Sequence, residues 1–268
     1  MKALLYREFV WFKRYFPDYL GMWAIQLGFS IGVVFMPAYI SGSQAYVLSR
    51  LKTLYGVEFT AGDLIAFTLT LSSLIGVVAL IVGDVFSTLY YEFRIAETSL
   101  TVMEASSLAD FLFYNALGRS SLLCFFATLY LLALLPLMKG LEGLFLYLAV
   151  LALLLPASIA LGLLSSILAL ATITLTPVRR PWAIANLIPP ILLASVGLYI
   201  PVELVPFLLR LVAYITPLPF VVEALQALLL SVSQPIMLGY LTMLVVVYTL
   251  YLTVPIVLLR RAERWIRC

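Results

Sequence analysis

Long runs without charged residues dominate the chain and predict membrane-spanning helices. The core of a bilayer needs about 20 consecutive apolar residues per helix. Stretches of this length lie within residues 19–49, 64–83, 120–138, 143–178, 181–202 and 224–259. We therefore expect a single all-α integral membrane domain over residues 1–268, with six transmembrane helices.

One apolar segment is too broken to form a spanning helix. Residues 198–220, LYIPVELVPFLLRLVAYITPLPF, are interrupted by Pro201, Pro206, Pro217 and Pro219. Residues 203–213 and 219–230 each predict a short apolar helix. Irregular backbone survives at membrane depth only where it is buried in protein or lines a cavity. We therefore expect residues 201–231 to form a re-entrant helical hairpin that enters from the external face before the last span.

The N-terminal residues MKALLYREFVWFKRYFPD carry an amphipathic helical pattern. Apolar side chains recur at helical spacing on one face, at Leu5, Phe9, Phe12 and Phe16. Arg7 and Arg14 lie on the opposite face. This pattern is typical of a helix that lies in the membrane interface, so residues 1–17 predict an interfacial helix.

The distribution of Lys and Arg predicts the orientation, because positive residues concentrate in cytoplasmic connections. With both termini inside, the internal segments hold Lys2, Arg7, Lys13, Arg14, Arg94, Arg119, Arg179, Arg180, Arg260, Arg261, Arg264 and Arg267. The external segments hold Arg50, Lys52, Lys139 and Arg210, so the ratio is 12 to 4. We expect both termini in the cytoplasm.

The connection at residues 90–118 is the longest cytoplasmic one. It contains one cation, Arg94, and the acidic residues Glu92, Glu97, Glu104 and Asp110. A loop of this length usually has a function. Two interpretations stay open: a docking site for a soluble partner, and a solvated helical connector.

Composition supports the membrane class and excludes several chemistries. The chain is 64% hydrophobic and 11% charged, with no histidine and a mean hydropathy of +1.13. Soluble domains carry about 25% charged residues. Cys124 and Cys268 offer neither a disulfide framework nor a metal site. Phosphate-loop, nucleophile-elbow and zinc-protease motifs are also missing from the sequence. We expect no catalytic residue, cofactor, metal or nucleic-acid partner in this chain.

Asp84 is the ionisable residue that stands out near a predicted span. Such residues are functional candidates, so Asp84 is a possible transport-pathway residue. Glu203, Arg210 and Glu223 can form ion pairs within the hairpin. Three alternatives to an ATP-driven subunit remain: a gradient-driven secondary transporter or channel, a membrane enzyme acting on lipids, and an assembly subunit.

The order of these parts resembles an ABC-2 type permease, the membrane subunit of certain ABC exporters. The resemblance covers the whole chain and is most specific in GLYIPVELVPFLLRLVAYITPLPFVVEAL, residues 197–225. The residues that match the family pattern in order are Gly197, Pro201, Pro206, Pro217, Phe220, Glu223 and Ala224. The family's cytoplasmic coupling segment corresponds to residues 90–118, and here the chain departs from the pattern, with AETSLTVMEASS where relatives carry a Gly-Thr-Leu-Glu run followed by Pro-x-Ser.

The resemblance implies an exporter of the cell membrane, built from two permeases and two cytoplasmic ATPase subunits that bind ATP and Mg. The second permease is either another copy or a paralogue, and the substrate stays open. The residues expected to couple to the ATPase are Arg7, Lys13, Arg94, Glu97 and Glu104. The residues expected at the external gate are Pro217, Phe220 and Glu223.

Overall fold

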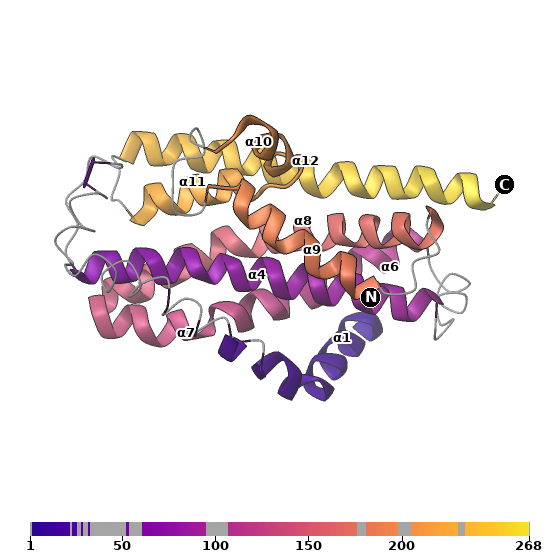
Figure 1. The fold of residues 1–268 in the computed structure, drawn as a ribbon, viewed down its shortest axis with the longest axis horizontal. Helices are drawn as coiled ribbons and strands as arrows, with labels where there is room; N and C mark the ends of the chain where they lie inside the picture. The colour runs from indigo at the N-terminus through magenta and orange to yellow at the C-terminus, as the bar shows by residue number, and fades with distance from the viewer. Residues whose placement is uncertain are drawn as a thin grey trace.

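The described part of the chain is helical throughout. A computed structural model describes residues 2–21, 23–25, 28, 32, 52–53, 61–94, 107–175, 181–197, 205–229 and 234–267. No strand occurs among these residues. The helices are α1 (Lys2–Arg14), α4 (Ala61–Arg94), α6 (Leu108–Asn115), η1 (Ala116–Ser120), α7 (Ser121–Lys139), α8 (Leu141–Leu175), α9 (Pro181–Ser195), α10 (Phe207–Ala213), α11 (Leu218–Leu229) and α12 (Gln234–Arg267). Figure 1 shows the long helices running along one axis, with α1 set apart at one end of the bundle.

Helix α4 is the centre of the bundle. It packs against α7, α8, α9 and α11, and 83% of its most apolar window is buried, against 17% for α12. The large side chains that α4 buries completely include Leu71, Leu74, Ile81 and Phe86. Helix α12 lies along one edge of the bundle (Figure 1) and exposes a nearly continuous apolar surface. A helix that is apolar on its exposed side fits a lipid environment rather than water.

Among the described residues, four helical segments are long and apolar enough to cross a membrane. They are Ile65–Phe93, Leu108–Lys139, Leu141–Ile173 and Leu238–Arg261. They overlap the predicted second, third, fourth and sixth spans. The predicted all-helical architecture is therefore confirmed for the described residues, and these helices are compatible with a multi-pass membrane protein. The first predicted span, 19–49, lies largely outside the described residues. The fifth overlaps α9, an apolar helix of 15 residues that is shorter than a membrane span. The count of six spans therefore stays a prediction.

Two helices extend beyond the charge-free stretches that mark their spans. Helix α4 continues past Asp84 to Arg94, and the next span begins at Leu108 rather than after Arg119. Both Asp84 and Arg119 are paired with opposite charges. A paired charge costs less inside an apolar helix than an isolated one. The pairing explains why these helices do not end at their charged residues.

The bent pair, α10 with α11, confirms that the proline-rich segment forms two short apolar helices. Their axes differ by 94°, and the pair is either a broken span or a re-entrant loop. Thr216 and Pro217 are buried at the break, where the Thr216 hydroxyl donates to the Ala213 carbonyl at 3.0 Å. Tyr251, near the middle of α12, donates its hydroxyl to the Tyr214 carbonyl. The break therefore lies beside the middle of α12 rather than at its end.

The turn between α7 and α8 depends on two glycines. Gly140 has φ = 59°, a left-handed conformation that favours glycine. Gly143 lies so close to the preceding helix that an added Cβ would sit 2.1 Å from the Leu135 carbonyl oxygen. At the same end of the bundle Lys139 bonds Asp63 at 2.7 Å, which ties this turn to the start of α4.

We predict that Gly143→Ala destabilises the protein, because the methyl group would collide with backbone atoms that have no room to move. The expected loss is about 1–3 kcal/mol, as for other overpacked sites. Gly239→Ala is the matched control, since a Cβ there meets nothing within 4 Å. Thermal unfolding in detergent measures both variants. Equal melting temperatures for the two would contradict the close approach of α7 and α8.

Candidate functional site

Helix α1 turns a charged side chain, rather than only apolar ones, toward the bundle. Glu8 is 2% exposed, whereas Tyr6, Phe9 and Val10 are exposed on other sides of the helix. Phe12 follows Glu8 on the packed side and contacts the rings of Tyr19 and Phe126 at 5.2 and 5.6 Å. Because a buried carboxylate is costly unless it is paired, the bundle must supply cations for Glu8.

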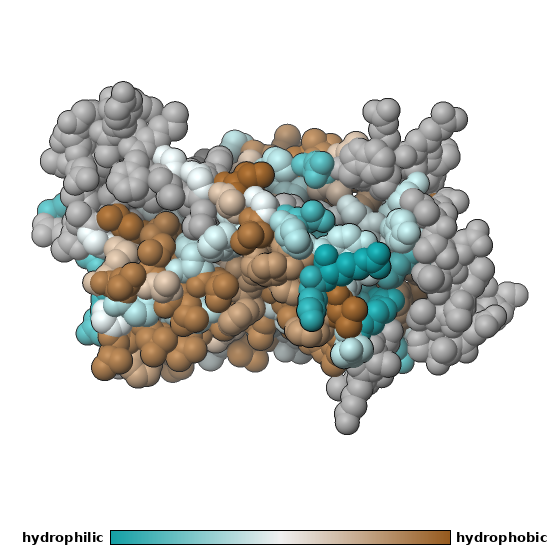
Figure 2. Space-filling model, turned by 90° about the horizontal axis from the view of Figure 1, so that it is seen from below, coloured by the Kyte–Doolittle hydropathy of each residue, from teal (hydrophilic) through white to brown (hydrophobic). Residues whose placement is uncertain are grey.

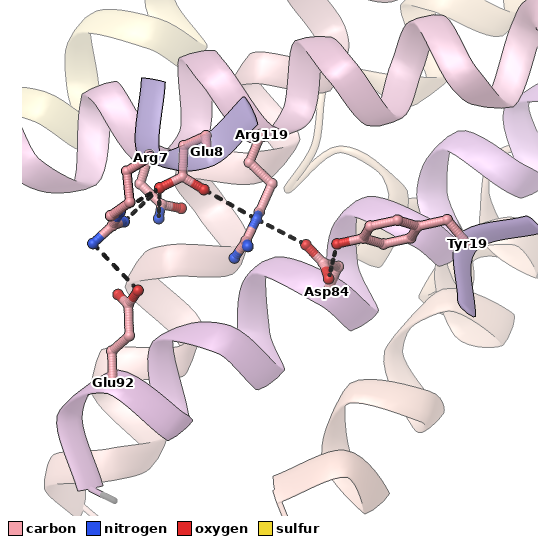
Figure 3. A network of polar contacts seen from close by, with 7 residues as sticks. Arg7, Glu8, Tyr19, Asp84, Glu92 and Arg119 are labelled. Atoms are coloured by element: carbon pink, nitrogen blue, oxygen red, sulfur yellow. Dashed lines mark hydrogen bonds and ion pairs between the residues drawn. The ribbon is translucent and has the colours of Figure 1, made fainter. Parts of the chain in front are cut away.

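Glu8 belongs to an ionic cluster that also contains Arg7, Asp84, Glu92 and Arg119. Arg119 Nε lies 3.2 Å from Glu8 Oε2 and 3.0 Å from Asp84 Oδ2. Arg7 contacts Glu8 and lies 3.3 Å from Glu92 Oε1. Figure 3 shows the carboxylate of Glu8 between the two guanidinium groups, with Asp84 and Glu92 on the outer sides. The cluster joins three segments: α1, α4 and η1.

Neutral donors complete the surroundings of the cluster. The Tyr19 hydroxyl donates to Asp84 Oδ1 at 2.7 Å, and Asn115 Nδ2 donates to Glu8 Oε1 at 3.3 Å. The Arg119 guanidinium also lies over the Trp11 ring, 5.3 Å from its centre. Together these contacts connect the first twenty residues to the bundle at several points.

The π-helical turn η1 positions Arg119. A π-turn inserted into an α-helix is uncommon and frequently marks a functional site. Gly118, in the same turn, lets α1 approach closely, since a Cβ there would sit 3.1 Å from Leu5 and 3.3 Å from Glu8. Arg119 is consequently only 3% exposed, although it carries a full charge.

The charges of the ionic cluster do not balance. Three carboxylates, on Glu8, Asp84 and Glu92, face two guanidinium groups, on Arg7 and Arg119. With all of these groups ionised, the sum is −3 + 2 = −1. Replacing both members of a buried ion pair by apolar residues often leaves stability unchanged. Removing only the cation leaves a buried carboxylate uncompensated, which is strongly destabilising.

The structure brings together some of the predicted site residues. Arg7 belongs to the ionic cluster, whereas Lys13 is exposed in the last turn of α1. Arg94 is the last residue of α4, and its side chain lies outside the described part, as do Glu97 and Glu104. Asp84, the predicted pathway residue, is held by Arg119 and Tyr19.

The predicted gate residues lie on the bent pair. Pro217 is buried in the break, and Phe220 is half-buried with its ring centre 5.5 Å from that of Tyr214. Glu223 is half-buried one turn further along α11. Gln226 Nε2 donates to the Gly197 carbonyl at 3.4 Å, so α11 is tied to the chain that follows α9.

Sequence reasoning missed the roles of Glu8, Tyr19 and Arg119 in the site. Arg119 entered only as a positive residue at the edge of a span, and Glu92 only as part of an acidic loop. A usable signal was present, because Glu8 interrupts an otherwise apolar and basic helix. An acidic residue in that position calls for a cation from another segment.

The described residues carry no recognisable catalytic or metal centre. No group of three or more Cys, Asp or Glu side chains among them could hold a metal ion. Comparison of the chain with protein-family models, curated proteins and solved structures finds no match. The ionic cluster, the bent pair and the apolar helices are the features of the described residues that bear on function.

We predict that Arg119→Gln destabilises the protein by about 3–5 kcal/mol, because it leaves Asp84 buried without its cation and Glu8 with Arg7 alone. Arg260→Gln is the matched control. The Arg260–Asp110 pair is 3.4 Å long and its side chains are 60% and 49% exposed, so its loss should cost at most about 1 kcal/mol. Denaturant unfolding in detergent measures both. A small, equal effect of the two changes would contradict the structural importance of Arg119.

Proposed function

We propose that the chain is the membrane-spanning permease subunit of an ATP-driven ABC exporter. In this proposal it forms the substrate pathway as a dimer with a second permease, and separate cytoplasmic subunits hydrolyse ATP. The protein lies in the cell membrane with both termini in the cytoplasm. The resemblance to ABC-2 type permeases suggests this function, and the arrangement of α1 supports it.

The ionic cluster is the observation that carries the proposal. A permease driven by separate ATPases needs a rigid connection between its cytoplasmic surface and its spans. Helix α1 is joined to η1 and to the last three turns of α4 through Glu8, Arg7 and their partners. A force applied to α1 would therefore reach two helices of the bundle directly. An anchor that only rests on the membrane needs no such connection.

Two further features agree with the proposal. The Arg260–Asp110 pair ties the C-terminal part of α12 to the start of α6, and α6 also contacts α1. In Figure 1 both ends of the chain lie in the same half of the bundle, as a shared cytoplasmic side requires. The bent pair contributes a broken segment whose second helix, α11, is largely buried, of the kind that lines or closes a pathway.

The gradient-driven alternative assigns Asp84 to ion binding. A carboxylate that carries a coupled ion has to exchange that ion during each cycle. Asp84 is instead held by a guanidinium at 3.0 Å and a phenol at 2.7 Å. This arrangement favours a structural role for Asp84 within the ionic cluster over a role as a free ion carrier.

The proposal predicts that the tagged chain, purified in gentle detergent from its own cells, brings an ATP-binding subunit with it in stoichiometric amount. ATP hydrolysis by this complex should fall severalfold in Arg7→Gln, because Arg7 links α1 to Glu92 in α4. Arg7 is partly exposed, which makes this variant milder than a change at Arg119. Mass spectrometry and a phosphate-release assay provide the two readouts.

Arg260→Gln serves as the control, with hydrolysis close to that of the wild type. A chain that purifies without an ATPase in several detergents would overturn the proposal. An ATPase whose hydrolysis ignores Arg7→Gln would leave the exporter in place and refute the role given to α1.

A further inference from the structure

An open cavity of about 340 Å³ lies between α1 with the residues that follow it and the last three turns of α4. Its wall carries four aromatic and two acidic side chains: Trp11, Tyr15, Tyr19, Tyr91, Asp18 and Asp84. Asp18 is exposed and Tyr91 is 47% exposed, so the cavity opens to the outside of the molecule. Figure 2 shows hydrophilic side chains gathered over the α1 region beside a broad apolar surface. The volume suits a small ligand group.

The charge of the wall is negative. Asp18 and Asp84 line the cavity, and none of its lining residues is Lys or Arg. Two cations border the wall without lining it: Arg119 pairs with Asp84 Oδ2, and the exposed Arg14 lies over the Tyr15 ring. The ionic cluster to which Arg119 belongs carries one excess carboxylate. An anionic ligand would be repelled here, whereas a cation would be attracted.

The aromatic side chains make an organic cation a better occupant than an inorganic one. Ring faces attract ammonium groups, and cages of aromatic residues are used to bind quaternary ammonium. Two rings of the cavity already lie near guanidinium groups: Trp11 at 5.3 Å from Arg119 and Tyr15 at 5.9 Å from Arg14. A hydrated metal ion would instead need several oxygen ligands around it.

We propose that this cavity binds the ammonium group of an amphipathic molecule. The carboxylate of Asp18 and the unshared lone pairs of Asp84 balance the charge, and the rings of Tyr91 and Tyr15 contact its alkyl substituents. The apolar tail lies along the adjacent lipid-facing surface. Two sources share this chemistry: the headgroup of an amine-containing lipid, and a free amphipathic amine.

The site goes beyond the proposed function and does not depend on it, because binding needs only the isolated chain. The test is therefore made on the protein alone, in maltoside micelles. The probe is phenyltrimethylammonium, followed by saturation-transfer NMR of its methyl protons. tert-Butylbenzene, which has the same shape without the charge, is the matched ligand control.

We expect phenyltrimethylammonium to bind specifically and tert-butylbenzene not to compete with it at equal concentration. Tyr91→Leu and Asp18→Asn should each weaken binding by about three- to tenfold, the loss of one cation–π or carboxylate contact. Tyr6→Leu is the control for the aromatic change, since Tyr6 is 69% exposed on α1 and does not line the cavity. It should leave the affinity unchanged.

The two sources are distinguished by adding lipid to the same sample. Displacement of the probe by phosphatidylethanolamine, but not by phosphatidylglycerol, identifies a lipid headgroup as the occupant. Retention of the probe with both lipids identifies a free amine. Equal competition by tert-butylbenzene, displacement by sodium at the same concentration, or equal loss in Tyr6→Leu and Tyr91→Leu would overturn the proposal.

Discussion

Arg119 is the cation on which the attachment of the N-terminal helix to the bundle depends. It bonds Glu8 of α1 and Asp84 of α4 through the same nitrogen, and its guanidinium covers the ring of Trp11. Both carboxylates face the interior, where unpaired charge is costly. The register of η1, the close approach at Gly118 and the inward orientation of Glu8 all follow from the need to bring these charges together.

This arrangement divides the surface of α1 and its continuation into two environments. One side is held by the ionic cluster, and others expose Tyr6, Phe9 and Val10, as suits a helix in the membrane interface. Between α1 and α4 lies the cavity with its acidic and aromatic wall. The ionic cluster therefore fixes α1 to the spans and leaves the cavity beside it open. The bent pair provides a break in the helices beside the middle of α12.

Apolar runs and prolines in the sequence were sufficient to predict the helical membrane class, four of the spans and the bent pair. The start of the third span at Leu108 was harder to predict, because hydropathy treats Arg119 as an isolated charge and takes no account of its pairing with Asp84. Glu8 was missed for the same reason, since the cation that it meets from the bundle, Arg119, lies 111 residues further along the chain. The coupling residues Glu97 and Glu104 lie outside the described part and remain predictions.

The central claim is that α1 and the inner part of α4 move as one body when the proposed ATPase acts. Spin labels at Lys13 and Tyr91, both accessible, with Cys268 replaced by Ser, report this by pulsed electron resonance on the ATPase complex. We predict that the Lys13–Tyr91 distance distribution within one protomer is the same with and without ATP and Mg, while the Lys13 distance between the two permeases changes. A Lys13–Tyr91 distribution that shifts or broadens on nucleotide binding would contradict the account.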